Sequence, residues 1–172
     1  MRAALLILAA ALAAAPALAG RVFTDAEILG VVSAAGKAGL DSAAVASGSA
    51  RSDAVKAFAD RTRRELEEAR EDEAEAAARA GLTPADSAAS LRMTKSAADE
   101  QARLSSLGRD EFDAAYVDAA ASDAEELVRA LDEELIPSAR DRAVAELLKR
   151  IRTSASRRLE HARRLQGVKS PS

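Results

Sequence analysis

Apolar residues recur every three or four positions from Ile28 to Leu165. This spacing lines them along one side of an α-helix, whereas a half-buried strand alternates apolar and polar residues. We find helical spacing throughout this region and no alternating stretch. The sequence therefore predicts an all-α protein, and the breaks in the pattern divide it into helices.

These breaks predict five helices. The expected helices cover residues 24 to about 46, 52–80, 83 to about 106, about 110–135, and 138–167. Residues 47–49 read as a loop, and glycines at 81 and 108 end two of the helices. Long helices joined by short connections favour an antiparallel bundle.

Capping residues set the expected helix starts. Thr24-x-x-Glu27 is a capping-box pattern, in which each side chain bonds the other residue's backbone. We expect Ser52 and Ser138 to cap the second and fifth helices. The third helix is predicted to start at Thr83-Pro84, because proline suits a first turn. Pro137 should end or sharply kink the fourth helix.

The predicted core is built from small side chains. Four aromatic residues and no tryptophan are present, and alanine dominates the apolar fraction. Burial stabilises by ~25 cal/mol per Å² of apolar area, so alanine contributes little. We expect closely packed helices and modest stability. The residues expected to face inward include Phe58, Thr62, Leu66, Leu91, Ala98, Ala102, Phe112, Tyr116, Leu131, Val144, Leu148 and Ala162.

The first nineteen residues have the features of a secretory signal peptide. Met1-Arg2 is followed by an apolar run over residues 3–15, and Ala17-Leu18-Ala19 is a small-x-small cleavage pattern. We predict a cleaved signal over residues 1–19, a bundle domain over 20–167 and a disordered tail over 168–172. The protein should then be periplasmic or secreted. From residue 20 onward no apolar run approaches the ~20 residues of a membrane span, so we expect no transmembrane helix in the mature chain.

Charge is zoned along the last two helices, although the formal net charge is only -3. Residues 110–134 carry ten acidic side chains and one basic one, whereas residues 140–172 carry ten basic and three acidic ones. We favour two neighbouring antiparallel helices that attract each other. The alternative is a basic face for an anionic partner such as lipid headgroups or nucleic acid. Its candidate contacts are Arg157, Arg158, Arg163 and Arg164, without the interleaved aromatics that bind bases, so nucleic acid is not expected.

Residues that could perform catalysis are scarce. The chain has no cysteine and a single histidine, His161, whose neighbours include four arginines. A di-iron bundle requires Glu-x-x-His pairs, and Arg158 precedes His161 by three positions. No phosphate-binding glycine-rich loop or serine nucleophile motif is present. We therefore predict no catalytic residues, no cofactor and a protein that is not an enzyme.

Several segments together resemble a known family. They are Asp25-Ala26-Glu27-Ile28-Leu29, Val55-Lys56-Ala57-Phe58-Ala59, Phe112-Asp113-Ala114-Ala115-Tyr116-Val117 with Glu125-Glu126, and Leu159-Glu160-His161-Ala162. In order and spacing they are similar to the exported bacterial ferritin-like family of the domain of unknown function 4142. The resemblance implies a four-helix core with one additional helix. Members usually carry a histidine on three helices, at positions matching Leu66, Ala124 and His161, so His161 is the residual metal candidate.

Three functional hypotheses follow. The first is an exported, non-enzymatic bundle that acts through its surfaces, by self-association as a homo-oligomer or by binding a cell-envelope partner. The second, implied by the resemblance, is a ferritin-like metal-binding protein with a degenerate site. The third is a protein that binds anionic envelope lipid through its basic C-terminal helix.

Overall fold

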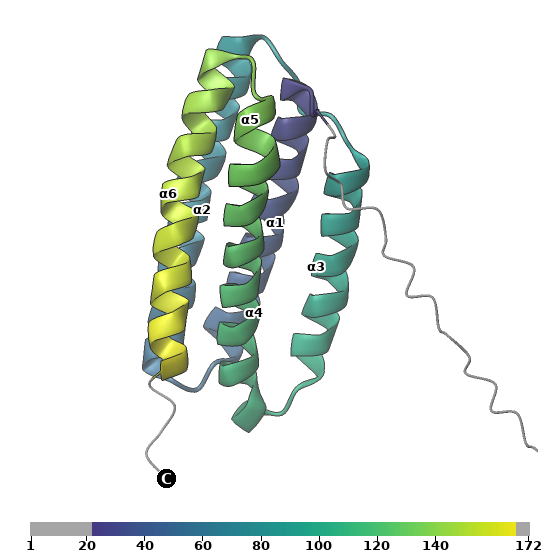
Figure 1. Cartoon of the computed structure of the whole chain (residues 1–172). Helices are drawn as coiled ribbons and strands as arrows, with labels where there is room; N and C mark the ends of the chain where they lie inside the picture. Colours follow the sequence, from purple (N-terminus) through teal and green to yellow (C-terminus); the bar gives the residue numbers. More distant parts are fainter. Residues whose placement is uncertain (1–21, 168–172) are drawn as a thin grey trace, which may run out of the picture.

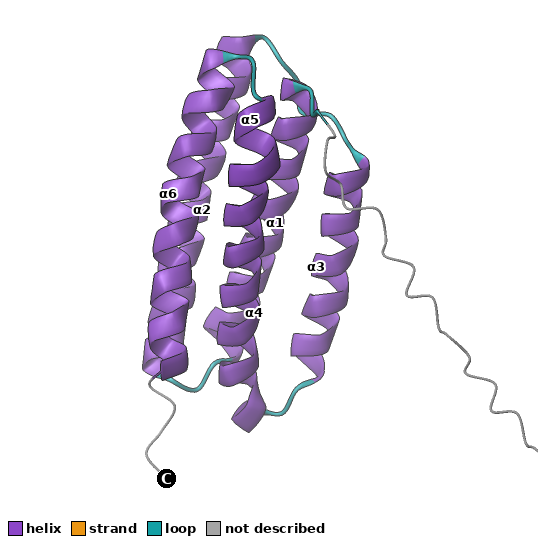
Figure 2. Cartoon of the chain, in the orientation of Figure 1, coloured by secondary structure: helices purple, strands orange, loops and turns teal. Residues whose placement is uncertain are grey.

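The computed structural model describes residues 22–167, and this range forms helices joined by short loops, without strands (Figure 2). The elements are α1 (Asp25–Ser49), α2 (Asp53–Ala80), α3 (Ala88–Ser106), α4 (Arg109–Ala130), η1 (Leu131–Leu135), α5 (Ile136–Ser138) and α6 (Arg142–Gly167). The prediction of an all-α helical bundle is confirmed. The predicted signal peptide and C-terminal tail lie outside the described residues and stay predictions.

The long helices pack side by side as a bundle (Figure 1). α1 packs along α2 and α3, α4 packs along α6, and α2 also contacts α6. Hydrogen bonds from Ser33 to Glu73 and from Ser47 to Asp60 show that α1 and α2 run antiparallel. α3 lies at one side of the bundle, away from α2 and α6.

The start of α1 follows the predicted capping box. The backbone N–H of Glu27 donates to the Thr24 hydroxyl over 3.2 Å, and the Glu27 carboxylate accepts from the Thr24 backbone over 3.0 Å. Asp25 lies in the first turn of the same helix and accepts the backbone N–H groups of Arg140 and Asp141. α1 is therefore joined at its start to the loop before α6.

The cap of α2 differs from the prediction. Ser52 stands at the N-cap position, but its side chain makes no capping bond. Instead the Asp113 carboxylate of α4 accepts the backbone N–H groups of Arg51 and Ser52 over 3.0 and 2.7 Å. A residue 61 positions away thus binds the turn that leads into α2.

Two helix boundaries were predicted wrongly. α1 runs through residues 47–49 to Ser49, where the Ser47 hydroxyl bonds the Ala43 carbonyl over 3.0 Å and also reaches Asp60. The third helix starts at Ala88 after a Ser87 cap, not at Thr83-Pro84. The preceding segment is instead held against α1, because the Ala85 N–H donates to the Ala26 carbonyl over 2.9 Å.

The connection from α4 to α6 is more continuous than predicted. The chain passes through the π-helical η1 and the short α5, which contains Pro137, and then ends its helical path at Ser138. A π turn before a proline accommodates the missing backbone donor. The fifth long helix is capped by Asp141, whose carboxylate accepts from Ala143 and Val144, and not by Ser138.

Buried apolar side chains form two clusters. The first consists of Phe23, Ile28, Leu29, Val31, Val32, Ala76, Ala77, Leu131, Leu135, Val144, Leu147 and Leu148. The second consists of Ala46, Ala50, Val55, Phe58, Ala59, Leu104, Phe112, Tyr116, Val117, Ala121 and Ala162. Each combines residues from opposite ends of neighbouring antiparallel helices. The core therefore has an apolar part near each end of the bundle.

α3 contributes less to the core than predicted. It buries only Ser90 and Leu104, whereas Leu91 is 58% exposed and Ala98 and Ala102 are also exposed. The prediction that these last three residues face inward is wrong. α3 packs mainly on one neighbour, α1, so a narrow side of the helix is sufficient to bury its contacts.

α1 is long and apolar enough to cross a membrane by length and composition, with a mean hydropathy of 1.3 over its most apolar window. Many small residues contribute to this mean hydropathy. They do not form one unbroken apolar run, so a search for such runs does not find this helix. A buried core helix has the same composition, and α1 supplies Ile28 and Leu29 to the first apolar cluster. The expectation of no transmembrane helix stays a prediction.

Candidate functional site

The two apolar clusters are separated by a small cavity in the middle of the bundle. Its volume is about 30 Å³, and its lining comes from α1, α2, α4 and α6: Val32, Ala35, Gly36, Leu66, Ala69, Arg70, Glu73, Leu127, Ile151, Ser154 and Arg158. Apart from Val32, which belongs to the first cluster, these residues lie along each helix between the members of the two clusters. Polar and charged side chains therefore reach the middle of the bundle, which the sequence predicted to be apolar.

Glu73 is the carboxylate at this cavity. Its side chain is only 6% exposed, and it accepts a hydrogen bond of 2.7 Å from the Ser33 hydroxyl of α1. Burial raises the pKa of Glu73, while the Ser33 bond and the charge of Arg70 oppose that increase. The neighbours of Glu73 on α2 are charged, so the sequence offers no sign that this residue is buried.

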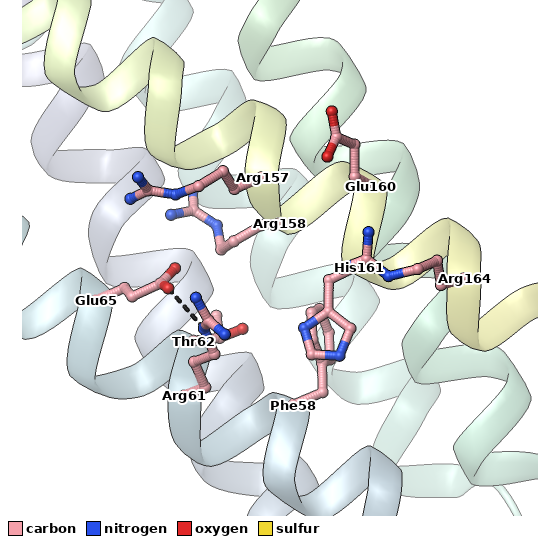
Figure 3. Close-up of a pocket in the computed structure, with 9 residues that line it drawn as sticks. All are labelled: Phe58, Arg61, Thr62, Glu65, Arg157, Arg158, Glu160, His161 and Arg164. Atoms are coloured by element: carbon pink, nitrogen blue, oxygen red, sulfur yellow. Dashed lines mark hydrogen bonds and ion pairs between the residues drawn. The ribbon is translucent and has the colours of Figure 1, made fainter.

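A larger pocket opens between α2 and α6 (Figure 3). Its volume is about 170 Å³, and it is lined by Phe58, Arg61, Thr62, Glu65, Arg157, Arg158, Glu160, His161 and Arg164. We call it the α2–α6 pocket. Four arginines and two glutamates make its lining basic when His161 is neutral.

Arg158 is shared by the pocket and the central cavity. Its guanidinium is half-buried and donates to the Ser154 hydroxyl over 3.3 Å. Burial lowers the pKa of Arg158, and the negative charge of Glu65 partly offsets this effect. Burial thus makes the charged guanidinium less favourable than it would be in water.

Arg61 and Glu65 form an i,i+4 ion pair on α2, with 2.8 Å between Arg61 Nε and Glu65 Oε1. Arg64 has the same spacing to Asp60 and to Glu68, but neither pair is among the ion pairs of the described residues. Asp60 accepts instead from the Ser47 hydroxyl of α1. Glu65 is therefore already engaged at the pocket wall.

His161 packs against an aromatic ring at the pocket. Its imidazole is edge-on to Phe58, with ring centroids 5.0 Å apart and planes at 80°. Partial burial and then the charges of Arg164 and Arg61 lower the pKa of His161, whereas Glu65 acts in the opposite direction. This lowering of the pKa favours the neutral imidazole, which has one N–H donor and one acceptor.

Thr62 carries a buried hydroxyl at the pocket wall. Its side-chain oxygen is shielded from solvent and has no hydrogen-bond partner among the described residues. A buried hydroxyl without a partner costs about 1–3 kcal/mol, so native structures rarely leave one unsatisfied. The sequence predicted Thr62 as an inward residue but gave no reason to assign it a binding role.

Most α6 arginines outside the pocket are paired across helices. Arg150 contacts Asp72 over 3.0 Å, Arg152 contacts Asp132 over 2.6 Å, and Arg163 contacts Glu125 over 3.1 Å. Arg152 is thus paired with η1 and Arg163 with α4, which confirms that α6 and the neighbouring acidic segment attract each other through opposite charges.

The four arginines predicted to contact an anion do not lie together. Arg157, Arg158 and Arg164 line the α2–α6 pocket, whereas Arg163 pairs with Glu125 of α4. Within residues 22–167, neither Arg157 nor Arg164 takes part in an ion pair. The pocket mouth therefore carries positive charge without a bound carboxylate.

The positions implied by the family resemblance do not share one cavity. Leu66 lines the central cavity, Ala124 is buried on α4, and His161 lines the α2–α6 pocket. Among the described residues, no group of three histidine or acidic side chains is placed to hold a metal ion. The proposed residual role of His161 toward a metal stays a prediction.

Comparison with known proteins yields one match. The model of a family described as a domain of unknown function (DUF4142) matches residues 8–165. No curated protein and no solved structure matches the chain.

Proposed function

Because the chain belongs to the family of the domain of unknown function (DUF4142), we propose a function from its own residues: it is an exported, non-enzymatic bundle that binds anionic envelope lipid at the α2–α6 pocket. The signal-peptide features of residues 1–19 support export. The basic lining of the pocket supports an anionic partner. An exported protein meets the lipid surfaces of the envelope, and a basic helix end attracts anionic lipids. Together these two features favour a lipid surface as the partner.

One observation carries this proposal. Along α6, Arg150, Arg152 and Arg163 are neutralised by carboxylates of neighbouring helices. Arg157 and Arg164 have no such partner in the described part of the chain and lie at the pocket mouth. Cations left unpaired on a helix rich in ion pairs are available to a negatively charged surface.

Vesicle co-sedimentation tests the proposal. The purified protein should bind vesicles of phosphatidylcholine that contain phosphatidylglycerol or phosphatidic acid, and it should not bind phosphatidylcholine alone. Binding should weaken with salt, because exposed charges are screened over ~8 Å at physiological ionic strength. The double variant Arg157→Gln/Arg164→Gln should lose most binding.

A control variant separates the pocket from overall charge. Arg150→Gln/Arg163→Gln removes the same charge from paired residues on the same helix. It should bind vesicles nearly as well as the original protein. Equal loss in both variants, or binding that does not respond to salt, would contradict a pocket-centred lipid contact.

We also propose that α1, α2, α4 and α6 form a ferritin-like four-helix core with α3 as the additional helix. The contacts of α1 with α2, α2 with α6 and α4 with α6 support this arrangement.

A degenerate metal site has support only from His161 and the resemblance. Stoichiometric iron, zinc or copper in untagged protein would favour it. Sedimentation analysis tests the expected self-association.

A further inference from the structure

We infer that the α2–α6 pocket is a binding site for one phosphate monoester group, which we call the seat. The group would be held between Arg158 and Thr62 at the pocket wall and Arg157 and Arg164 at the pocket mouth. This inference rests on the proposed function and deepens it. The pocket would recognise one particular chemical group. A diffuse attraction between a basic helix and a membrane does not require such recognition.

Arg158 is the anchor of this seat. Its guanidinium is a planar fork of donors that matches the oxygens of a phosphate group. The side chain is half-buried, and it donates a hydrogen bond of 3.3 Å to a neutral hydroxyl, that of Ser154. An anion in the pocket would supply the strong acceptor that this half-buried cation does not have among the described residues.

Thr62 provides a second, independent indication. Its hydroxyl is buried on the α2 side of the same pocket and has no partner in the described part of the chain. Only 8% of Thr62 is exposed, so bulk solvent does not satisfy this group. A phosphate oxygen at the pocket wall would accept a hydrogen bond from this hydroxyl.

The remaining groups fit a dianion better than a singly charged diester. A phosphate monoester carries a charge of about −1.5 to −2 at pH 7 and three acceptor oxygens. Arg157 and Arg164 supply two further guanidinium groups, and the neutral imidazole of His161 supplies one N–H donor. A phosphodiester has two free oxygens and one charge, and would leave part of this donor set unused.

The acidic residues of the lining do not block the seat. Glu65 is held by Arg61 in an ion pair of 2.8 Å. The carboxylate of Glu160 extends away from the other pocket side chains (Figure 3). At about 170 Å³ the pocket has room for several water molecules, and thus for a phosphate group with a small substituent.

Titration calorimetry of the purified protein with inorganic phosphate and glycerol phosphate tests the seat. Both should bind with one-to-one stoichiometry. Thr62→Val keeps the shape of the side chain and removes its hydroxyl, so it should weaken phosphate binding about tenfold, the effect of losing a hydrogen bond to a charged group. The same variant should unfold at an equal or higher temperature, because it also removes an unsatisfied buried group.

Two further variants complete the test. Arg158→Lys keeps the charge but loses the planar fork, and should weaken phosphate binding while circular dichroism verifies the fold. Thr153→Val changes an exposed threonine of α6 outside the pocket, and should leave binding unchanged. Equal phosphate affinity in Thr62→Val and the original protein, or no phosphate binding at all, overturns the inference.

Vesicles distinguish this inference from the proposed function. A monoester seat predicts stronger binding to phosphatidic acid than to phosphatidylglycerol at matched surface charge. Equal binding to both lipids, with no binding of soluble phosphate, overturns the seat and leaves the lipid-binding function standing. Binding of soluble phosphate that depends on Thr62, without vesicle binding, supports the seat. It would show that the phosphate group bound there does not come from a lipid.

Discussion

The imidazole of His161 on α6 stands edge-on to the ring of Phe58 on α2, with 5.0 Å between ring centroids. Such an edge-to-face pair joins the two helices that form the α2–α6 pocket. It also keeps the single histidine of the chain in a partly buried, basic environment. This environment sets the direction in which the pKa of His161 is shifted.

The pKa of His161 should lie below 6.5 in the folded protein, because burial, Arg164 and Arg61 disfavour the imidazolium more than Glu65 favours it. The unfolded state then binds the proton more readily. The associated stability is present above pH 6.5 and is lost as pH falls through the folded pKa. A histidine NMR titration and urea unfolding between pH 5 and 7.5 test this.

The control is His161→Gln, which cannot titrate in this range. Its unfolding free energy should vary less with pH than that of the original protein. A histidine that titrates above 6.5 would show that the nearby carboxylate outweighs the arginines.

Glu73 should make stability vary with pH in the opposite direction from His161, and Glu73→Gln removes this contribution. The raised pKa of Glu73 means that the folded state binds this proton more tightly than the unfolded state does. Its contribution is fully present below the unfolded pKa of 4.5 and declines as pH rises through the folded value. The variant should therefore be at least as stable as the original protein at pH 7, and should lose this advantage near pH 4.

Urea unfolding at several pH values measures this effect. Glu71→Gln, an exposed neighbour on α2, is the matched control and should show little change. A loss of stability at pH 7 in Glu73→Gln would mean that the bond from Ser33 to the carboxylate outweighs the cost of burying the charge.

Two glycines of α1 should respond oppositely to alanine. A Cβ at Gly30 would lie 2.0 Å from the Ala85 carbonyl oxygen, so Gly30→Ala should force the 82–87 segment away and cost about 1–3 kcal/mol. A Cβ at Gly36 meets nothing within 4 Å, so Gly36→Ala should stabilise the helix by about 0.5–1 kcal/mol. Thermal unfolding of both variants is the measurement. A neutral Gly30→Ala would contradict the close docking of this segment.

Asp113→Ala should destabilise the protein by about 1–3 kcal/mol, because its carboxylate accepts two backbone N–H groups in the turn before α2. Asp110→Ala is the matched control one turn earlier on α4. It removes an exposed ion pair with Arg51, and should cost less than about 1 kcal/mol. Equal losses in denaturant unfolding would argue against the capping role of Asp113.

The exported protein should begin at Gly20. Mass spectrometry and N-terminal sequencing of protein recovered from the envelope or medium measure this directly. Ala19→Arg places a large charged residue at the predicted cleavage site and should leave the precursor unprocessed. Recovery of the intact Met1 form from the original sequence would contradict the signal-peptide prediction.

The spacing of apolar residues was sufficient to predict most helix interiors. Phe58, Tyr116, Val144 and Leu148 are all buried as expected. The spacing failed on α3, where Leu91 is exposed, because periodicity cannot tell how many neighbours a helix will have.

The candidate site was predicted only in part. Three of the four selected arginines line one pocket, but no linear pattern joins them with Thr62 and Phe58 on a helix about a hundred residues away. Glu73 was missed for a related reason. A charged residue among charged neighbours looks solvated until another helix covers it.

Local sequence determined where this chain is helical, which residues line each helix and how charge is distributed along it. These properties depend on neighbours within one or two turns, so a linear pattern can carry them. Tertiary packing alone decided that Asp113 caps another helix and that Glu73 is buried beside Ser33. It also placed Arg157 and Arg164 in one pocket with Thr62, whose hydroxyl has no partner among the described residues. Those outcomes depend on which helix faces lie against each other, and on the burial and electrostatic effects that only this contact creates.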